Sequence, residues 1–90
     1  MPFVYLVECS DGTLYAGWTT DLTSRLEAHN RGTGARYTRG RRPVRLVYWE
    51  ESGSREAAMR REAALRRLSR RQKLDLIARQ ERILSQHGGV

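Results

Sequence analysis

The sequence has few of the features that mark disulfide-bonded, membrane-spanning or secreted proteins. Its only cysteine is Cys9, so an intramolecular disulfide is excluded and a reducing compartment is expected. No apolar run approaches the roughly 20 residues that a membrane-spanning helix needs. Residues 1–5 carry no basic side chain and lead directly into strand-like residues, which argues against a signal peptide. We therefore expect a soluble cytoplasmic protein with no membrane partner.

The length and the distribution of apolar residues indicate one folded domain. The chain has 90 residues, and the 39% that are hydrophobic are spread along it, which excludes a disordered composition. No internal repeat, linker or low-complexity segment divides it. We expect a single domain over residues 1–90, with its core in about residues 3–78. Residues 79–90 are expected to hold the end of a C-terminal helix and a frayed tail from His87.

The chain is strongly basic, with a formal charge of +7, and Lys73 is the only lysine among its 17 cationic residues. Such a charge points to nucleic acid or another polyanion, whereas a solubilising surface is the alternative. Residues 31–45 contain six arginines and no acidic residue, and their glycines predict a mobile loop. This loop could follow a phosphate backbone and offer a ring for stacking. Its nucleic-acid-binding candidates are Arg31, Arg36, Tyr37, Arg39, Arg41 and Arg42.

The pattern of apolar residues and turn signals predicts the element order ββαβαα. Three segments rich in β-branched and aromatic residues are typical of strands: residues 3–9, 13–18 and 44–50. Three segments with helical periodicity are expected to be helices: about residues 22–31, about residues 55–68, and residues from 69 onward. In the last helix, Leu74, Ile77 and Ala78 are expected to face inward. This order predicts an α+β fold, in which three helices flank a small three-stranded antiparallel sheet.

Polar residues occupy positions where the first helix should be apolar. Leu22, Arg25, Leu26 and His29 are spaced i, i+3, i+4 and i+7, so they share one face. An arginine on that face is costly unless it meets an anion or opens onto a cleft. The alternative is that Arg25 extends to solvent from the edge of the stripe and that His29 is a satisfied, half-buried ring.

The second helix has a similar anomaly at Glu62, which lies in the apolar arc between Met59 and Leu65. A carboxylate in that position needs a cation, which could be a metal ion. The alternative is a salt bridge to one of three arginines: Arg61, Arg66 or Arg25.

Tyr5 and Tyr15 lie ten residues apart on the two strands of the predicted hairpin. A two-residue turn at Asp11 and Gly12 would place their rings on opposite faces, because side chains alternate along a strand. A three-residue loop over residues 10–12, with Gly12 in the left-handed conformation, would place both rings on one face. Two such tyrosines could also be ordinary core residues whose hydroxyls reach solvent.

Taken together, these residues resemble the GIY-YIG nuclease superfamily. The segments 3–5 (Phe-Val-Tyr) and 15–17 (Tyr-Ala-Gly) are similar to the two halves of its motif. Arg25 stands where the family has its helix arginine, His29 where it has a histidine or tyrosine, and Glu62 where it has its metal-binding glutamate. The resemblance covers about residues 3–78 and is closest to small stand-alone bacterial members, with the expected fold being GIY-YIG-like.

The sequence departs from the family pattern at three places. Phe3 replaces the first glycine and Ala16 replaces the isoleucine of the second half, and both are apolar strand positions. Trp18 follows Gly17 where some relatives carry a lysine thought to help activate the tyrosine. We interpret the first two as changes in packing, and the third as a change in how the tyrosine is activated.

The resemblance implies a metal-dependent endonuclease that hydrolyses phosphodiester bonds. It implies that Glu62 holds one Mg²⁺ or Mn²⁺ as a Lewis acid and that Arg25 binds a phosphate oxygen. Tyr15 is the candidate to orient or deprotonate the water, with Tyr5 and His29 completing the catalytic set. Which of these last three is the general base stays open.

Two other functions remain possible on the sequence: a nucleic-acid-binding module of the same fold with weak or no catalysis, and a basic adaptor for a protein partner. No zinc ligands, helix-turn-helix or second module is visible in the sequence. We therefore expect a structure-selective or weakly sequence-selective protein, with DNA favoured over RNA as its partner.

Overall fold

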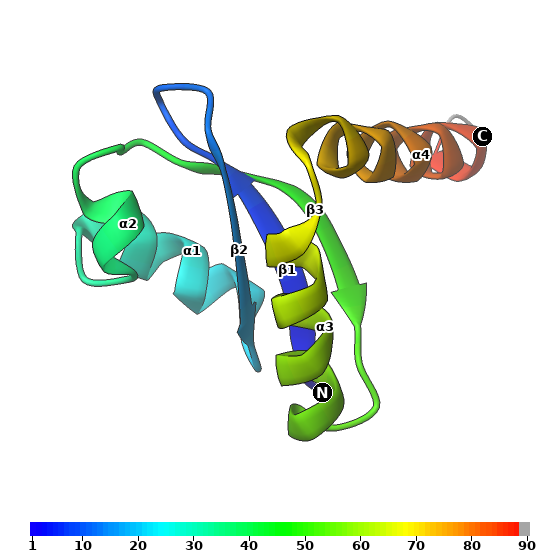
Figure 1. The fold of residues 1–90 in the computed structure, drawn as a ribbon, viewed down its shortest axis with the longest axis horizontal. Helices are drawn as coiled ribbons and strands as arrows, with labels where there is room; N and C mark the ends of the chain where they lie inside the picture. The colour runs from blue at the N-terminus through cyan, green and yellow to red at the C-terminus, as the bar shows by residue number, and fades with distance from the viewer. Residues whose placement is uncertain (89–90) are drawn as a thin grey trace.

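The computed structural model describes residues 1–88 and confirms the predicted α+β architecture. Within these residues, seven elements follow in the order β1 (Phe3–Glu8), β2 (Leu14–Thr19), α1 (Leu22–Arg31), α2 (Arg36–Arg39), β3 (Arg45–Glu51), α3 (Arg55–Arg67) and α4 (Arg70–Gly88) (Figure 1). The predicted order ββαβαα is thus present, with the single-turn helix α2 added. The prediction of an irregular loop is wrong at α2, because this turn is helical.

The sheet has the strand order β2-β1-β3, and both strand pairs are antiparallel. In the hairpin, the Cys9 N–H donates to the Thr13 carbonyl at 2.8 Å, which leaves residues 10–12 as a three-residue loop. Gly12 has φ 84°, a conformation that favours glycine. The longer of the two predicted loops is therefore correct. Tyr5 pairs with Gly17 and Tyr15 with Val7, so both tyrosines lie on the same face.

The helices begin at the polar residues that the sequence offers as caps. Asp21 Oδ1 accepts the Ser24 N–H at 3.1 Å, and Ser54 Oγ accepts the Ala57 N–H at 3.1 Å. At α4, Ser69 and Gln72 form a capping box: Ser69 Oγ accepts the Gln72 N–H, and the Gln72 side-chain carbonyl accepts the Ser69 N–H. These bonds satisfy helix N–H groups that would otherwise lack partners, and so fix where each helix starts.

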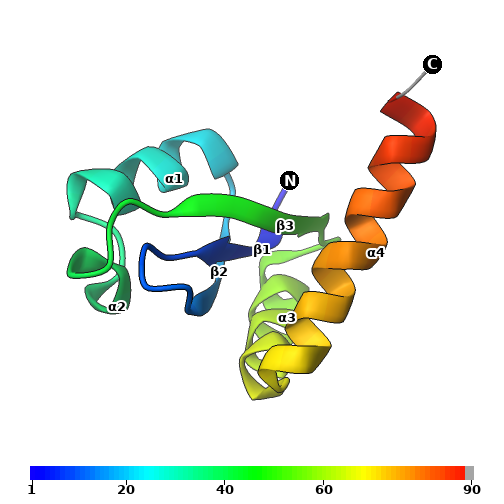
Figure 2. The ribbon, with the colours of Figure 1, turned by 90° about the horizontal axis from the view of Figure 1, so that it is seen from above.

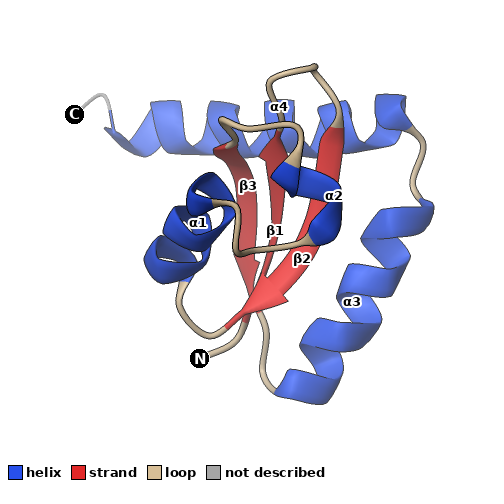
Figure 3. Ribbon diagram, turned by 90° about the vertical axis from the view of Figure 1, so that its left-hand side faces the viewer, coloured by secondary structure: helices blue, strands red, loops and turns tan. Residues whose placement is uncertain are grey.

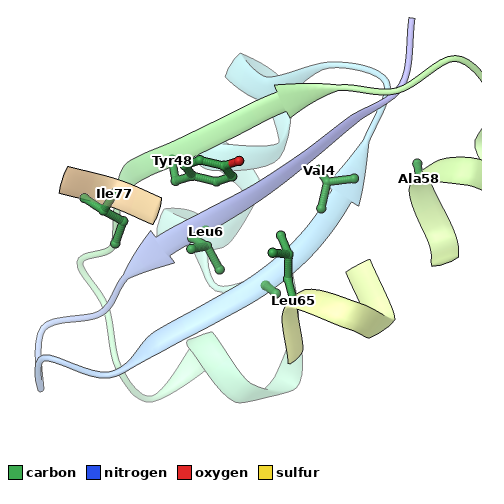
Figure 4. Packing of buried hydrophobic residues seen from close by; sticks show 7 residues of the cluster. Val4, Leu6, Tyr48, Ala58, Leu65 and Ile77 are labelled. Carbon is green, nitrogen blue, oxygen red and sulfur yellow. The ribbon is translucent and has the colours of Figure 1, made fainter. Parts of the chain in front are cut away.

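One face of the sheet carries an apolar core. Val4 and Leu6 of β1 pack there with Leu65 of α3, and all three are fully buried (Figure 4). Helix α3 runs alongside the edge strand β2, and α4 lies against the other edge strand, β3 (Figure 3). The apolar face therefore anchors both C-terminal helices to the sheet.

Helix α4 presents only one of the three predicted residues to the core. Ile77 is buried, but Leu74 is 39% exposed and Ala78 is also exposed. The Gln80 side chain turns toward β3, where its amide bonds both the N–H and the C=O of Trp49 at the outer edge of the strand (3.2 and 2.6 Å). The buried stripe is displaced because this edge offers backbone groups that the Gln80 amide can satisfy.

The C-terminal part of α4 projects beyond the sheet (Figure 2). The helix continues through Gly88, past the point where the sequence predicted a frayed tail. The part of that prediction that concerns residues 89–90 lies outside the described residues. Across residues 1–88, no helix combines the length and apolar character needed to cross a membrane.

The opposite face of the sheet packs against α1 (Figure 2). It holds polar groups as well as apolar ones. Val7 is buried there, and Leu22 and Leu26 of α1 pack against it as predicted. Tyr5, Tyr15 and His29 lie on the same face. This mixed face, at the end where α1, α2 and β2 meet, holds the candidate site.

Candidate active site

Gly17 determines how closely Tyr5 can approach β2. The two residues pair directly across the strands, and Tyr5 is 2% exposed. A Cβ added at Gly17 would fall on the hydroxyl and ring of Tyr5. Glycine is therefore required at this position by a close approach rather than by an unusual backbone conformation. The pairing places the Tyr5 ring over Gly17, and its hydroxyl reaches His29 of α1.

His29 is fully buried, not half-buried as the alternative interpretation expected, and both of its ring nitrogens are hydrogen-bonded. Nε2 lies 2.8 Å from the Tyr5 hydroxyl and Nδ1 lies 2.8 Å from the Thr38 hydroxyl. The Thr38 hydroxyl also donates to the Ala35 carbonyl at 3.0 Å, and a carbonyl oxygen can only accept. Nδ1 must then carry the proton, and Nε2 accepts the Tyr5 O–H.

A longer contact argues for the other tautomer: the Ala35 N–H lies 3.5 Å from Nδ1. We assign the proton to Nδ1 because the three bonds of 2.8–3.0 Å are stronger than this one. Burial lowers the pKa of His29, and the positive charge of Arg25 lowers it further. The ring is therefore neutral at pH 7, and its Nε2 can accept a hydrogen bond from the Tyr5 O–H.

Thr38 is a site residue that the sequence did not indicate. It lies on α2 and is fully buried against His29. The segment reaches His29 because Gly34 is small: a Cβ there would lie 2.9 Å from the His29 Cα. The glycines of residues 31–45 could have revealed this, since glycine marks close backbone approach as well as mobility. Here one of them allows the loop to pack on the histidine.

Arg25 connects the buried network to solvent. Its Nε donates to the Tyr5 hydroxyl at 3.4 Å, and among the described residues it forms no salt bridge. The guanidinium borders an open hollow of about 370 Å³, whose lining residues are Trp18, Thr19, Thr20, Arg25 and Arg55. Arg25 thus opens onto a cleft, which was one of the two conditions that make an arginine acceptable on this face.

Glu62 reaches the same end of the molecule from α3. Its side chain is 18% exposed, and Arg66 lies 3.5 Å from its Oε1. Of the three arginines that could have paired with it, Arg66 is therefore the partner, whereas Arg61 pairs with Glu50 at 2.6 Å. The Arg66 guanidinium also donates to the Tyr15 hydroxyl at 3.4 Å.

The Arg66 side chain of α3 reaches Tyr15 around the edge of the sheet. Helix α3 buries Leu65 on the apolar face, but it runs beside the edge strand β2 (Figure 3). Arg66 can therefore reach Tyr15 on the other face. The negative charge of Glu62 also contributes to raising the pKa of Tyr5, although burial is the main cause and Arg25 opposes it. The five predicted catalytic side chains thus lie close together.

Tyr37 and Arg41 extend the aromatic surface beside Tyr15. The Tyr15 and Tyr37 rings are stacked, with centroids 5.5 Å apart and an interplanar angle of 20°. The Arg41 guanidinium lies 4.0 Å from the Tyr37 ring centroid. It also donates to the Tyr37 carbonyl at 2.7 Å and to Asp11 at 3.1 Å. Arg41 therefore holds Tyr37 in place as well as contributing charge.

The remaining predicted nucleic-acid-binding arginines divide into two groups. Arg42 donates to the carbonyls of Arg39 and Asn30, at 2.9 and 3.4 Å, and Arg31 lies 3.9 Å from Glu27. Arg36 and Arg39 are exposed, and their guanidinium groups form no hydrogen bond or salt bridge among the described residues. These two have the charge most available for a phosphate.

Glu62 fits a magnesium-type ion and not a zinc-type one. Among the described residues, no group of three or more His, Cys, Asp or Glu side chains could hold a metal. A single carboxylate with several waters and a substrate phosphate is typical of Mg²⁺ or Mn²⁺. Glu62 is partly exposed, and Arg66, at 3.5 Å, is its one ionic partner in the described part of the chain, so its oxygens remain available.

Comparison with known proteins gives consistent matches over most of the chain. The family model for the GIY-YIG catalytic domain matches residues 1–75. A UPF0213 protein of Clostridium perfringens is 50% identical over 78 residues, which are 87% of this chain and 84% of the relative. A UPF0213 protein of Staphylococcus aureus is 51% identical over 75 residues, which are 83% and 92% of the two chains.

Two solved structures are also similar. The solution NMR structure of a UPF0213 protein from Bacillus halodurans has a TM-score of 0.55 and 48% identity, with 87% of this chain and 84% of that chain covered. The solution NMR structure of a protein from E. faecalis has a TM-score of 0.53 and 42% identity, with 79% and 76% covered.

Proposed function

The chain belongs to the GIY-YIG catalytic domain family, as its sequence predicted, and we propose that it is an endonuclease that hydrolyses phosphodiester bonds with one divalent metal ion. The observation that carries this proposal is the meeting of five side chains from four elements at the edge of β2: Tyr5, Tyr15, Arg25, His29 and Glu62. A phosphodiester needs an activated water, charge neutralisation and help for the leaving oxygen, and this set offers groups for each.

Tyr15 is the residue that we place against the attacking water. The Tyr5 hydroxyl is buried and donates to His29, whereas Tyr15 is partly exposed and its hydroxyl faces Arg66 beside Glu62. Tyr5 and His29 would then position Tyr15 without meeting the water, since the His29 ring packs edge-on against both tyrosine rings, with each pair of ring centroids 5.8 Å apart. Burial raises the pKa of Tyr5, so its hydroxyl keeps its proton at pH 7.

Arg25 would bind a non-bridging oxygen of the scissile phosphate. Among the described residues it has no carboxylate partner, and it borders the hollow next to Arg55, so its charge is free to meet an anion. A fixed cation at a developing negative charge contributes about 10²–10³ in rate. Glu62 would hold Mg²⁺ or Mn²⁺, which when bound supplies Lewis acidity to the phosphate and leaving oxygen.

We propose that the basic segment next to the site carries the nucleic acid. Arg36 and Arg39 supply free charge, while Tyr37 supplies a ring beside Tyr15. Arg31, Arg41 and Arg42 contribute charge from positions that also support the loop. With no further recognition module among the described residues, the protein would be structure-selective or weakly sequence-selective, with DNA ahead of RNA.

The test is incubation of the full chain with labelled DNA and RNA structures in Mn²⁺, beside Glu62→Gln. Cleavage should fall at least about 100-fold in this variant, because the carboxylate that holds the metal is lost. Glu56→Gln removes the same charge from an exposed position of α3 and should cleave like the wild type. Equal cleavage by Glu62→Gln and wild type would refute the assignment. Salt-sensitive binding without any product would instead identify a binding module of the same fold.

A further inference from the structure

Arg66 occupies a position that the family resemblance did not assign. It is one helical turn beyond Glu62 on α3, and its guanidinium lies 3.5 Å from the carboxylate and 3.4 Å from the Tyr15 hydroxyl. It also lies 5.6 Å from the centroid of the Tyr15 ring. One cation therefore bridges the proposed metal ligand and the residue proposed to meet the water.

A divalent ion that binds Glu62 must compete with this guanidinium. Both cations use the same carboxylate, and two positive charges beside it repel each other. The Arg66 side chain is 53% exposed and its contact with Glu62 is long, so it can leave without breaking a buried bond. When it leaves, its five N–H donors become available to a nearby oxyanion.

We infer, on the basis of the proposed function, that Arg66 is the resident counter-ion of Glu62 and couples metal binding to phosphate binding. In the free protein it weakens the binding of metal to Glu62. A phosphate in the site takes over the guanidinium, and the carboxylate is then released to the metal. By linkage, each ligand raises the affinity for the other. Arg66 is a positioning residue in this scheme, since it acts through Glu62 and Tyr15.

The chain offers a matched control for charge at the next residue. Arg67 is exposed on the same helix, and its guanidinium forms no hydrogen bond or salt bridge among the described residues. Arg66→Gln and Arg67→Gln remove the same charge from neighbouring positions, so a general electrostatic effect would appear in both. A specific counter-ion effect would appear only in Arg66→Gln.

The experiment is a Mn²⁺ titration of the full chain, followed by the electron paramagnetic resonance signal of the free ion. Arg66→Gln should bind Mn²⁺ at least about 5-fold more tightly than wild type, and Arg67→Gln should stay within about 2-fold of it. Sodium sulfate, an oxyanion probe, should tighten Mn²⁺ binding by wild type relative to sodium chloride of equal ionic strength. It should have no such effect on Arg66→Gln.

The outcomes separate this inference from the proposed function. If Glu62→Gln weakens Mn²⁺ binding but Arg66→Gln does not tighten it more than Arg67→Gln does, the counter-ion role is wrong and the metal site stands. If Glu62→Gln binds Mn²⁺ as well as wild type does, the metal site is wrong and the inference falls with it. Arg66→Met, which keeps the apolar stem of the side chain, should repeat the Arg66→Gln result if the glutamine variant folds poorly.

Discussion

The two faces of the sheet are built from the same strands but differ in what they hold. On one face Val4 and Leu6 pack with Leu65 in an apolar cluster. On the other, Tyr5 of the same strand bonds His29, and every fully buried side-chain nitrogen and oxygen among the described residues has a partner. Alternation along β1 thus places residues for stability and residues for chemistry one position apart. A change on one face should therefore leave the other face intact.

Leu65→Ala should give the largest loss of stability and the clearest test of this separation. Leu65 is fully buried in the apolar cluster, and removing such a leucine side chain costs about 2–5 kcal/mol of unfolding free energy. Urea unfolding followed by circular dichroism measures the loss. Leu84→Ala is the control, because Leu84 is 51% exposed and should change stability little.

Cleavage by Leu65→Ala, measured well below its melting temperature and corrected for the folded fraction, should equal that of wild type. A fall in cleavage of the folded protein would mean that packing on the apolar face also positions the site, through α3, which carries Glu62 and Arg66. The separation of stability from chemistry would then be wrong.

Gly17→Ala tests the opposite case, in which one methyl group should disturb the site itself. The Cβ would meet the Tyr5 ring, and Tyr5 cannot move away without losing its bonds to His29 and Arg25. Overpacking of this kind costs about 1–3 kcal/mol, and cleavage should fall with stability. Gly53→Ala, where an added Cβ has no neighbour within 4 Å, should behave like wild type in both assays.

Adding Tyr5→Ala to Gly17→Ala should recover part of the stability cost of the glycine change, because the clashing ring is then absent. The comparison is with Tyr5→Ala alone, which keeps the glycine. If Gly17→Ala destabilises equally in both backgrounds, the contact with Tyr5 is not the reason for the glycine.

Features set by neighbours in the sequence were the ones that could be predicted. Composition and turn signals gave the strands, helical periodicity gave the helices that begin near residues 22 and 69, and one of the two loops considered, the one ending in Gly12, placed the tyrosines on one face. Each depends on the chemistry of a few adjacent residues, so a single sequence contains the information. The spacing of Arg25 and His29 likewise predicted their shared helix face, which the structure places against Tyr5.

Features set by distant neighbours could not be predicted. The helical period alone does not say which stripe of α4 is buried, and Gln80 faces β3 because it meets the backbone of Trp49 at an open strand edge. Thr38 reaches His29 only after α2 has folded onto α1. Of the three arginines that could pair with Glu62, Arg61 instead pairs with the distant Glu50 of β3, which leaves Glu62 with Arg66, one turn along its own helix.

The smallest expected effect concerns pH and His29. Burial lowers the pKa of His29 below its ordinary value of 6.5, so between these two values the unfolded chain binds a proton that the folded protein excludes. The contribution of neutral His29 to the free energy of unfolding is therefore fully present above about pH 6.5, and it decreases as pH falls through this window. It levels off below the folded-state pKa. The slope is at most about 1.4 kcal/mol per pH unit, the value for one proton.

Urea unfolding from pH 8 to pH 5, compared between wild type and His29→Gln, isolates this dependence. His87 and all carboxylates are common to both proteins, so only the wild-type excess slope reports His29. If the unfolding free energies of the two proteins change with pH in parallel, protonation of His29 does not destabilise the folded protein. That result would contradict the assigned hydrogen bonds, because a protonated Nε2 would turn its N–H toward the Tyr5 oxygen and displace the Tyr5 proton from its acceptor.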